Sequence, residues 1–339
     1  MTTDKVDSEE AIIAAFWAPL AEGFPGAFGL KDDCAAISLP PGFDLVVTTD
    51  AVVAGVHVLP DENPGAIGWK ALAVNVSDLV AKGASPLAYL MSFGLPEMPE
   101  RNWLAEFAQG LARAQAAFGC RLIGGDTDRV PGPLSVSITA LGTIPRGRFV
   151  QRATAQAGDL VYVSGTIGDA ALGLALRRDP SLAARWKLGA AGAAQLESRF
   201  SMPVPPVALA GVIRAYARAA IDISDGLVKD FDRLCRTSHV GGRLDAARVP
   251  LSAPAGAVVA DKCVALEALL TGGEDYEVLA IVAPERAADF EHAAAASGHP
   301  VTRIGVILDA SDGIGVIGTD GRSMTFTATG WDHFRTPAG

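Results

Sequence analysis

The chain has 339 residues, of which 50% are hydrophobic and 19% are charged, and its formal net charge is −10 at pH 7. This length and hydrophobicity exclude a disordered chain and predict about two globular domains with large buried cores. The acidic balance argues against nucleic acid as a partner, because phosphate backbones are bound by clustered Lys and Arg.

The N-terminal segment and the cysteines argue against two further classes of protein. Four acids and only one basic residue, Lys5, precede or enter the first apolar run, which is unlike a signal peptide. That run, over 11–21, is too short to cross a bilayer, which needs ~20 residues, so we predict a helix there. The four cysteines lack CxxC spacing, which disfavours a disulfide framework or a zinc site. We therefore expect a cytoplasmic protein without a membrane partner.

The next elements of the first half are a strand and a helix. β-Branched residues predict a strand over 43–49 that ends at Asp50. After a loop that contains Pro and Gly, apolar residues at helical spacing begin at Trp69. Asp78 falls on a polar stripe of this helix and therefore projects from a helix face.

A second helix, predicted over 102–118, leads into a short strand at 121–123 and a Gly124-Gly125-Asp126 turn. Another strand is predicted over 134–141. The two glycines let the backbone approach a ligand, and Asp126 is placed to bind a metal at the same point. The alternative is a glycine bulge with a capping aspartate.

A polar, basic segment over 145–158, poor in large apolar residues, separates the halves of the chain. We place the boundary there, with domains at 1–150 and 151–339. The second half carries predicted strands at 160–163, 276–282 and 301–308, a helix at 285–297, and a helix-strand-helix around 222–234. Because strands and helices alternate in both halves, we predict α/β or α+β layers.

Two loops of the second half are candidates for ligand binding. Residues 164–169 (SGTIGD) lie between a strand and a helix, where phosphates often bind, but they match neither G-x-G-x-x-G nor a P-loop. A tight strand-to-helix connection is the alternative. The second loop is at 222–226 (DISDG), where Asp222 and Asp225 lie about one helical turn apart. Ser224 or Asp225 also fits a helix N-cap, but a cap does not explain Asp222 inside an apolar strand.

Isolated aspartates close several apolar or Gly-rich segments. They are Asp50, Asp78, Asp126, Asp225 and Asp275, and the pair Asp32-Asp33 precedes another apolar stretch. Desolvated carboxylates need a positive partner, and few Lys or Arg adjoin these acids in the sequence. We therefore predict an external cation. Magnesium is favoured, because Mg²⁺ sites built from a few carboxylates usually serve phosphates.

Eight segments, taken in chain order, resemble the thiamine-monophosphate kinase family and span nearly the whole chain. They are DDCAAI (32–37), TTDAVVAGVH (48–57), WKALAVNVSDLVAKGASP (69–86), IGGDT (123–127), GDLVYVSGTIGDAALGL (158–174), IDISDGL (221–227), GGEDYE (272–277) and GWDHF (330–334). Each is modest alone, and their order and joint presence are specific. The wider superfamily includes aminoimidazole-ribotide synthetase, selenophosphate synthetase and a hydrogenase-maturation protein.

The resemblance implies an aminoimidazole-ribotide synthetase-like fold. Its N-terminal α+β domain binds metal and nucleotide and pairs its sheet across a homodimer, and its C-terminal domain is α/β. The implied reaction is ATP-dependent phosphorylation of thiamine monophosphate to thiamine diphosphate, the last step of thiamine diphosphate biosynthesis, by direct in-line transfer. The acceptor phosphate is already an anion, since its second pKa is about 6, so no catalytic protein base is expected.

The resemblance also implies three sets of binding residues. Several Mg²⁺ ions would be held by Asp33, Thr48, Thr49, Asp50, Asp78, Asp126, Asp222 and Asp225. ATP would contact Gly125, Arg152 and Ser224, and thiamine phosphate would contact His57, Glu274 and Trp331. Asp275 receives no role. Three positions depart from the family pattern: Lys31 stands where Gly is usual, Val58 where an aromatic commonly follows His57, and Pro206 where an arginine follows a proline.

Two alternatives to the kinase stay open from the sequence. One is another ATP-using enzyme of the superfamily, either aminoimidazole-ribotide synthetase-like or selenophosphate synthetase-like. The latter is expected to carry a reactive cysteine in its N-terminal Gly-rich region, and Cys34 lies instead in a segment shared with the kinases. The other alternative is a non-catalytic cation-binding protein, which predicts an EF-hand-like loop that the sequence lacks.

Overall fold

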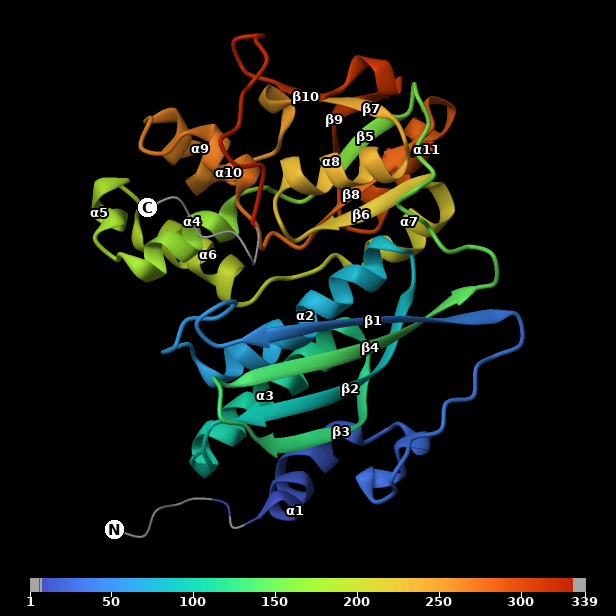
Figure 1. Cartoon of the computed structure of the whole chain (residues 1–339), viewed down its shortest axis with the longest axis vertical. Coiled ribbons are helices and arrows are strands. Elements are labelled where there is room, and N and C mark those ends of the chain that lie inside the picture. Colours follow the sequence, from blue (N-terminus) through green and yellow to red (C-terminus); the bar gives the residue numbers. More distant parts are fainter. Residues whose placement is uncertain (1–5, 7, 332–339) are drawn as a thin grey trace. The chain divides into compact units, whose positions relative to one another are not determined.

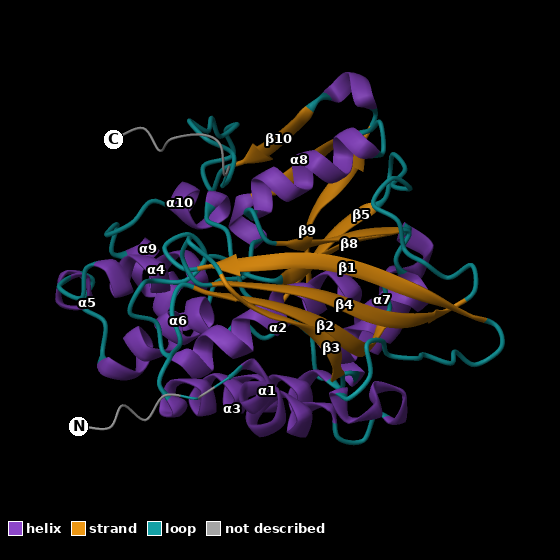
Figure 2. Ribbon diagram, turned by 60° about the horizontal axis from the view of Figure 1, so that its bottom comes forward, coloured by secondary structure: helices purple, strands orange, loops and turns teal. Residues whose placement is uncertain are grey.

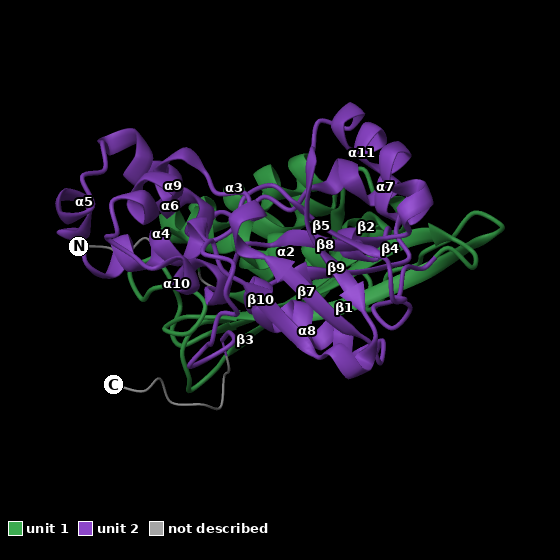
Figure 3. Ribbon diagram, turned by 90° about the horizontal axis from the view of Figure 1, so that it is seen from above, with its two compact units in different colours: residues 1–79, 84–148 green, residues 80–83, 149–339 purple. Residues whose placement is uncertain are grey.

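The computed structural model describes residue 6 and residues 8–331, and the chain divides into two compact units (Figure 3). Unit 1 comprises Met1–Leu79 and Ala84–Arg148, and unit 2 comprises Val80–Gly83 and Phe149–Gly339. No helix in the described part of the chain is long and apolar enough to span a membrane.

Unit 1 is built on a four-stranded sheet with the order β1-β4-β2-β3. Its strands are β1 (Phe43–Val53), β2 (Ser85–Leu95), β3 (Arg121–Arg129) and β4 (Ser135–Pro145). β4 pairs antiparallel with both β1 and β2, whereas β2 and β3 are parallel. β1 is therefore an edge strand.

Helices α2 (Pro64–Ala81) and α3 (Arg101–Phe118) cover one face of this sheet (Figure 2). Phe93 of β2 stacks on Phe107 of α3 at 4.7 Å between ring centroids, and Trp17 packs edge-on against both rings. This aromatic core anchors the N-terminal segment, which is helical as predicted over 11–21. The helix type changes along it, from α1 (Glu9–Ile12) to a π-helical turn (Ile13–Trp17) and a 3₁₀ turn (Ala18–Ala21).

Two sequence predictions in unit 1 are wrong. β1 does not end at Asp50 but continues to Val53, because its pairing with β4 continues to Ser135. The side chain of Asn75 accepts from the backbone N–H of Asp50 at 2.8 Å. The Gly124-Gly125-Asp126 turn is instead part of β3. Gly125 lies opposite Met91, and a Cβ on this glycine would lie 1.8 Å from the Met91 carbonyl oxygen. The glycine therefore permits close strand approach inside a sheet.

Unit 2 contains a six-stranded sheet with the order β10-β7-β9-β5-β8-β6 (Figure 1). The strands are β5 (Leu160–Ser164), β6 (Ala219–Ile223), β7 (Gly241–Asp245), β8 (Glu277–Val282), β9 (Val301–Leu308) and β10 (Ile314–Ile317). Only the β10–β7 pair is parallel among these strand pairs. The strands predicted at 160–163, 276–282 and 301–308 are confirmed as β5, β8 and β9, and the strand predicted around Asp222 is confirmed as β6. Strands β7 and β10 were not predicted.

Two helices pack on opposite faces of this sheet. Phe231 and Leu234 of α8 (Leu227–Thr237) join the core cluster that contains Val161 and Val163 of β5. Tyr162, which alternates to the other face, packs against Phe290 of α11 (Ala287–Ala296) at 5.2 Å between ring centroids.

The remaining helices of unit 2 complete its scaffold. They are α4 (Asp169–Arg178), α5 (Leu182–Arg185), α6 (Ala190–Ser201), α7 (Ala210–Tyr216), α9 (Ala253–Ala260) and α10 (Leu266–Thr271). Residues of α4, α6, α9 and α10 form a second apolar cluster of the unit, which includes Leu176 and Leu196. This cluster holds α4 against α6.

Candidate functional site

In unit 1, strand β1 and helix α2 bring three of the predicted metal ligands together. Thr48 donates through Oγ1 to Asp78 Oδ2 at 2.5 Å. Asp50 projects from the same face of the strand as Thr48, because side chains two residues apart share a face. Thr49 points to the other face, where its hydroxyl donates to the carbonyl oxygen of Ile138 at 3.1 Å. Strand alternation therefore separates the Thr49 side chain from this group.

Asp33 and Asp126 line one cavity of unit 1, of about 600 Å³. Gly125 and Trp17 also line it. Asp126 Oδ1 accepts from the backbone N–H of Thr127 at 2.8 Å, which fixes one of its two oxygens. The cavity thus joins the DDCAAI and IGGDT segments, which are far apart in the sequence.

The carboxylates differ in burial from one another. Asp222 is buried, as expected for an acid in apolar surroundings. Asp33, Asp50 and Asp126 are exposed, so the expectation that these acids are desolvated within the chain is wrong. Asp50 and Asp126 lie on strands, where successive side chains alternate between faces, and both carboxylates face solvent, as does that of Asp33.

His57 lies in the turn that follows β1, and hydrogen bonds fix both its ring and its carbonyl oxygen. Its Nδ1 accepts from the backbone N–H of Val53 at 3.1 Å, so the neutral ring carries its proton on Nε2. Its carbonyl oxygen accepts from Nζ of Lys70, a fully buried lysine of α2. The neighbouring Val58, which departs from the family pattern, is a buried core residue.

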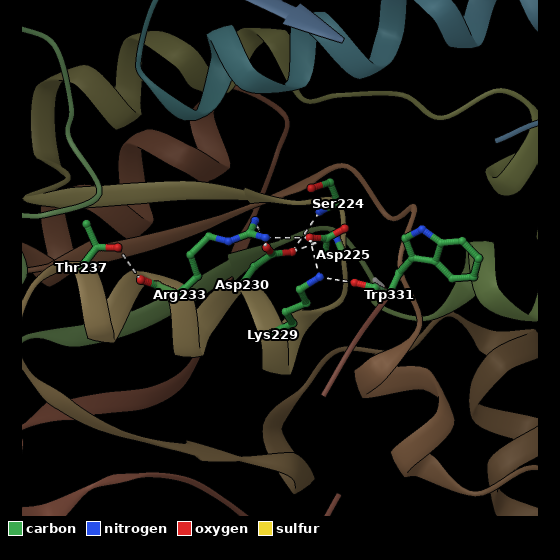
Figure 4. A network of polar contacts seen from close by, with 7 residues as sticks. All are labelled: Ser224, Asp225, Lys229, Asp230, Arg233, Thr237 and Trp331. Carbon is green, nitrogen blue, oxygen red and sulfur yellow. Dashed lines mark hydrogen bonds and ion pairs between the residues drawn. The ribbon is translucent and has the colours of Figure 1, made fainter. Parts of the chain in front are cut away.

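In unit 2, the loop after β6 forms a network of charged side chains (Figure 4). Asp225 Oδ2 pairs with Lys229 Nζ at 3.0 Å and with Arg233 Nη2 at 2.8 Å. Since these cations lie one and two turns along α8, they reach the carboxylate from one helix face. For Asp225, the expectation that compensation comes only from an external cation is wrong.

Asp230, which sequence analysis missed, holds the same loop from inside. Its Oδ2 accepts from the backbone N–H groups of Ser224 (3.1 Å) and Asp225 (2.9 Å), and its Oδ1 pairs with Arg233. Burial, with the charge of Asp225 second, raises the pKa of Asp230 to about 6. Gly226 precedes α8 without a side-chain cap, so neither Ser224 nor Asp225 is the N-cap considered from sequence.

Two further predicted segments dock on this loop. The backbone N–H of Glu274 donates to the carbonyl oxygen of Ser224 at 2.8 Å. The backbone N–H of Trp331 donates to the carbonyl oxygen of Asp225 at 3.0 Å, and Lys229 donates to the Trp331 carbonyl oxygen (Figure 4). Unit 2 therefore groups Ser224, Asp225, Glu274 and Trp331, with the Trp331 indole 42% exposed.

The remaining predicted ATP contacts fall in different parts of the chain. Gly125 belongs to unit 1, whereas Arg152 and Ser224 belong to unit 2. Arg152 is half-buried, and its carbonyl oxygen accepts from the hydroxyl of Ser238, the residue after α8, at 2.8 Å. That bond anchors the backbone of Arg152 to unit 2.

The glycine loop 164–169 binds the protein's own carboxylates. The backbone N–H of Gly168 donates to both oxygens of Asp275 at 3.0 Å, and Ser164 donates to Glu277 at 2.6 Å. A Cβ on Gly165 would lie 2.1 Å from the Glu277 carboxylate. These contacts support a strand-to-helix connection over a phosphate site, and they place Asp275 in the interior.

The predicted metal ligands lie in separate groups and all carry oxygen atoms. Among residues 6 and 8–331, no set of three or more His, Cys, Asp or Glu side chains is arranged to hold a metal ion. The predicted ligands instead form three smaller groups, at Thr48, Asp50 and Asp78, at Asp33 and Asp126, and at Asp222 and Asp225. All offer carboxylate or hydroxyl oxygens, which are the ligands that Mg²⁺ prefers. The donor set therefore fits Mg²⁺.

Comparison with known proteins gives consistent matches along the chain. Residues 31–144 match AIR synthase related protein, N-terminal domain, and residues 156–318 match AIR synthase related protein, C-terminal domain. A thiamine-monophosphate kinase of Caulobacter vibrioides is 40% identical over 325 residues, which cover 95% of this chain and 89% of that protein.

Two solved structures are similar over most of their length. Thiamine-monophosphate kinase from Stenotrophomonas maltophilia K279a has a TM-score of 0.76 and 36% identity, covering 87% of this chain and 91% of that chain. AaThiL complexed with AMPPCP and TMP has a TM-score of 0.75 and 33% identity, covering 91% and 97%.

Proposed function

The chain belongs to the thiamine-monophosphate kinase family, and from this premise we propose how its residues carry out the reaction. It phosphorylates thiamine monophosphate to thiamine diphosphate with ATP. The observation that carries this conclusion is 40% identity to a kinase of the family over 95% of the chain. The predicted family, two-domain fold class and activity are confirmed by these matches.

We propose that several Mg²⁺ ions bind the oxygens of Asp33, Thr48, Asp50, Asp78, Asp126, Asp222 and Asp225. The Thr49 side chain is left out of this set, because it points to the other face of β1. When bound, Mg²⁺ would neutralise phosphate charge and orient the phosphoryl group for in-line transfer. A cation is needed, because a chain with a net charge of −10 repels two phosphorylated substrates.

The chain's own hydrogen bonds orient these ligands before any ion arrives. Thr48 fixes one oxygen of Asp78, and Asn75 fixes the backbone at Asp50. In unit 2, Asp230 holds the Ser224–Asp225 backbone while Lys229 and Arg233 restrain the Asp225 carboxylate. Such preorganisation lowers the entropy that must be lost when ligands and substrates are bound.

The substrate contacts follow from side-chain chemistry. We propose that Gly125, Arg152 and Ser224 contact ATP and that His57, Glu274 and Trp331 contact thiamine monophosphate. The exposed indole of Trp331 offers a face to the cationic ring of thiamine, an arrangement favoured by cation–π attraction. Glu274, whose backbone binds the same loop, adds a negative charge. No protein base is proposed, because the acceptor phosphate is already ionised.

We also propose that the enzyme is a homodimer that pairs through the sheet of unit 1. Phe43, Leu45 and Val47 alternate on the exposed face of edge strand β1, with exposed fractions of 36%, 41% and 56%. A long apolar edge strand is normally covered, because it otherwise promotes aggregation. The cytoplasmic location stays a prediction.

The decisive assay combines purified protein, ATP, Mg²⁺ and thiamine monophosphate, with the products separated by chromatography. Thiamine diphosphate should form only when all components are present. Asp126→Ala should lose activity and retain its melting temperature, since the side chain is exposed. Absence of thiamine diphosphate under several metal conditions contradicts the assignment, and near-normal turnover of Asp126→Ala contradicts its metal role.

A further inference from the structure

A second cavity, of about 680 Å³, lies in unit 2 and is lined by three arginines from three elements. Arg243 belongs to β7, Arg303 to β9, and Arg248 to a 3₁₀ turn (Ala246–Arg248) that follows β7. None of these arginines belongs to the loop after β6 or to the segments that dock on it. The cavity is therefore a separate feature of the molecule.

The arginines of this cavity lack carboxylate partners. In the part of the chain that the structure describes, no ion pair involves Arg243, Arg248 or Arg303, whereas Arg199, Arg218 and Arg233 all pair with acids. Arg248 Nε donates to the backbone carbonyl oxygen of Arg303 at 2.8 Å. This bond links the 3₁₀ turn after β7 to strand β9. Three arginines that line one cavity without an ion pair are unexpected in a chain of net charge −10.

One acid, Asp245, lines the cavity, and one of its oxygens is already used in a backbone hydrogen bond. Asp245 Oδ1 accepts from the backbone N–H of Ala247 at 3.0 Å, so this oxygen serves the turn that carries Arg248. A single carboxylate cannot neutralise three guanidinium groups. The cavity therefore keeps a net positive charge.

Strand register places Arg243 and Arg303 on the same face of the sheet. Arg243 lies opposite Val306, and Arg303 lies opposite Tyr162, whose ring packs against α11. These side chains therefore share the face that is opposite α8. Next to Arg243, strand β10 contributes Gly315, where an added Cβ would meet nothing within 4 Å. The glycine leaves room above the sheet beside the arginine.

We propose that this cavity binds a small phosphate-bearing anion at a site distinct from that of phosphoryl transfer. Guanidinium groups present planar, fork-shaped donors that match phosphate oxygens and remain charged at all relevant pH values. Three guanidinium groups that line one cavity give it a positive potential, which attracts an anion. Inorganic pyrophosphate, ATP and thiamine diphosphate share the chemistry that the site recognises.

The test is calorimetric titration of the full-length protein in EDTA, so that metal-dependent binding is suppressed. Pyrophosphate, ATP and thiamine diphosphate are titrated in turn, and their affinities identify the preferred source of phosphate. We expect saturable 1:1 binding of at least one of them per chain. The double variant R243Q/R303Q should weaken this binding by roughly ten-fold or more, because two charge-assisted hydrogen-bond donors are lost.

Two control variants separate this site from its alternatives. Arg322→Gln removes an exposed arginine of the same unit that contacts Asp320 at 3.9 Å, and it should leave the affinity unchanged. Arg152→Gln removes the proposed ATP contact of the phosphoryl-transfer site and should leave the affinity for pyrophosphate unchanged. All variants are checked for an unaltered melting temperature. No saturable binding, equal affinity of the R243Q/R303Q variant, or loss of binding in Arg152→Gln instead would overturn the proposal.

Discussion

Unit 2 contains two clusters of acids beside strand-to-helix loops, and they differ in how their charge is satisfied. Under the loop 164–169, Asp169, Asp275 and Glu277 are at most 5% exposed. In the loop after β6, the Asp225 carboxylate stays 20% exposed and is paired with Lys229 and Arg233. We call Asp169, Asp275 and Glu277 the sealed cluster. We call Asp225, with Glu274 and Trp331 whose backbones bind its loop, the open cluster.

The difference lies in which groups satisfy the carboxylate oxygens. In the sealed cluster, the partners are fixed donors, such as the Gly168 N–H and the hydroxyls of Ser164 and Ser252. In the open cluster, Asp225 is held by side chains that water reaches and that can be displaced. A fully satisfied buried carboxylate stabilises one conformation, whereas a partly exposed one is available to a ligand.

The largest effect that separates the clusters is expected for Asp225→Asn. Its kcat/KM should fall by roughly 10²-fold or more, since loss of a ligand exceeds the effect typical of supporting residues. Its unfolding free energy should change by less than about 1 kcal/mol, because the lost ion pairs are partly exposed. Steady-state kinetics and urea unfolding measure the two quantities. A strongly destabilised variant with normal kcat/KM would make Asp225 a structural residue.

Arg199→Ala, next to the sealed cluster, is expected to lower stability and to leave activity nearly unchanged. Arg199 Nη2 pairs with Glu277 at 2.6 Å, and its removal leaves a buried carboxylate without its cation. Unit 2 should lose about 3 kcal/mol of stability, while the kcat of the folded fraction stays close to wild type. Arg236→Ala is the matched control, because its pair with Asp232 is on the surface and contributes less than about 1 kcal/mol. Equal melting temperatures for the two variants would contradict a structural role for the sealed cluster.

The residues of the open cluster can be predicted from the sequence, but the cations that pair with Asp225 cannot. Asp225, Glu274 and Trp331 are indicated by the segments IDISDGL, GGEDYE and GWDHF. The cations of the cluster are not evident from the sequence, because they are not adjacent to Asp225 in the chain. Lys229 and Arg233 lie four and eight residues after Asp225, a spacing that a helix brings onto one face.

Other failures have equally local causes. The glycine pair before Asp126 is typical of a turn, but here Gly125 accommodates the carbonyl of a neighbouring strand. Asp230 was missed because one buried acid in an amphipathic helix gives no pattern of its own. Which strand lies beside another is set by long-range packing, and no short segment encodes it.

A smaller effect, on pH dependence, is expected for Asp275. Burial raises the pKa of this carboxyl well above its ordinary range. The folded state therefore binds this proton more tightly than the unfolded state, so stability falls as pH rises from the unfolded pKa, about 3.9, through the raised folded pKa. Asp275→Asn should flatten this slope, because an amide has no proton to lose in this range. Urea unfolding at a series of pH values tests it, and an unchanged slope would exclude Asp275 as its source.

The smallest effect is expected for Lys229→Met, which tests whether the open cluster also positions Trp331. Lys229 contacts both the Asp225 carboxylate and the Trp331 carbonyl oxygen, so its loss should loosen the segment that carries the indole. The KM for thiamine monophosphate should rise a few-fold, as expected for an interaction of roughly 1 kcal/mol, with little change in the KM for ATP. Lys187→Met removes a surface ion pair with Asp261 and serves as the control. Equal increases of both KM values would assign Lys229 to the Asp225 side of the site alone, because a residue that positions Trp331 must affect the two substrates differently.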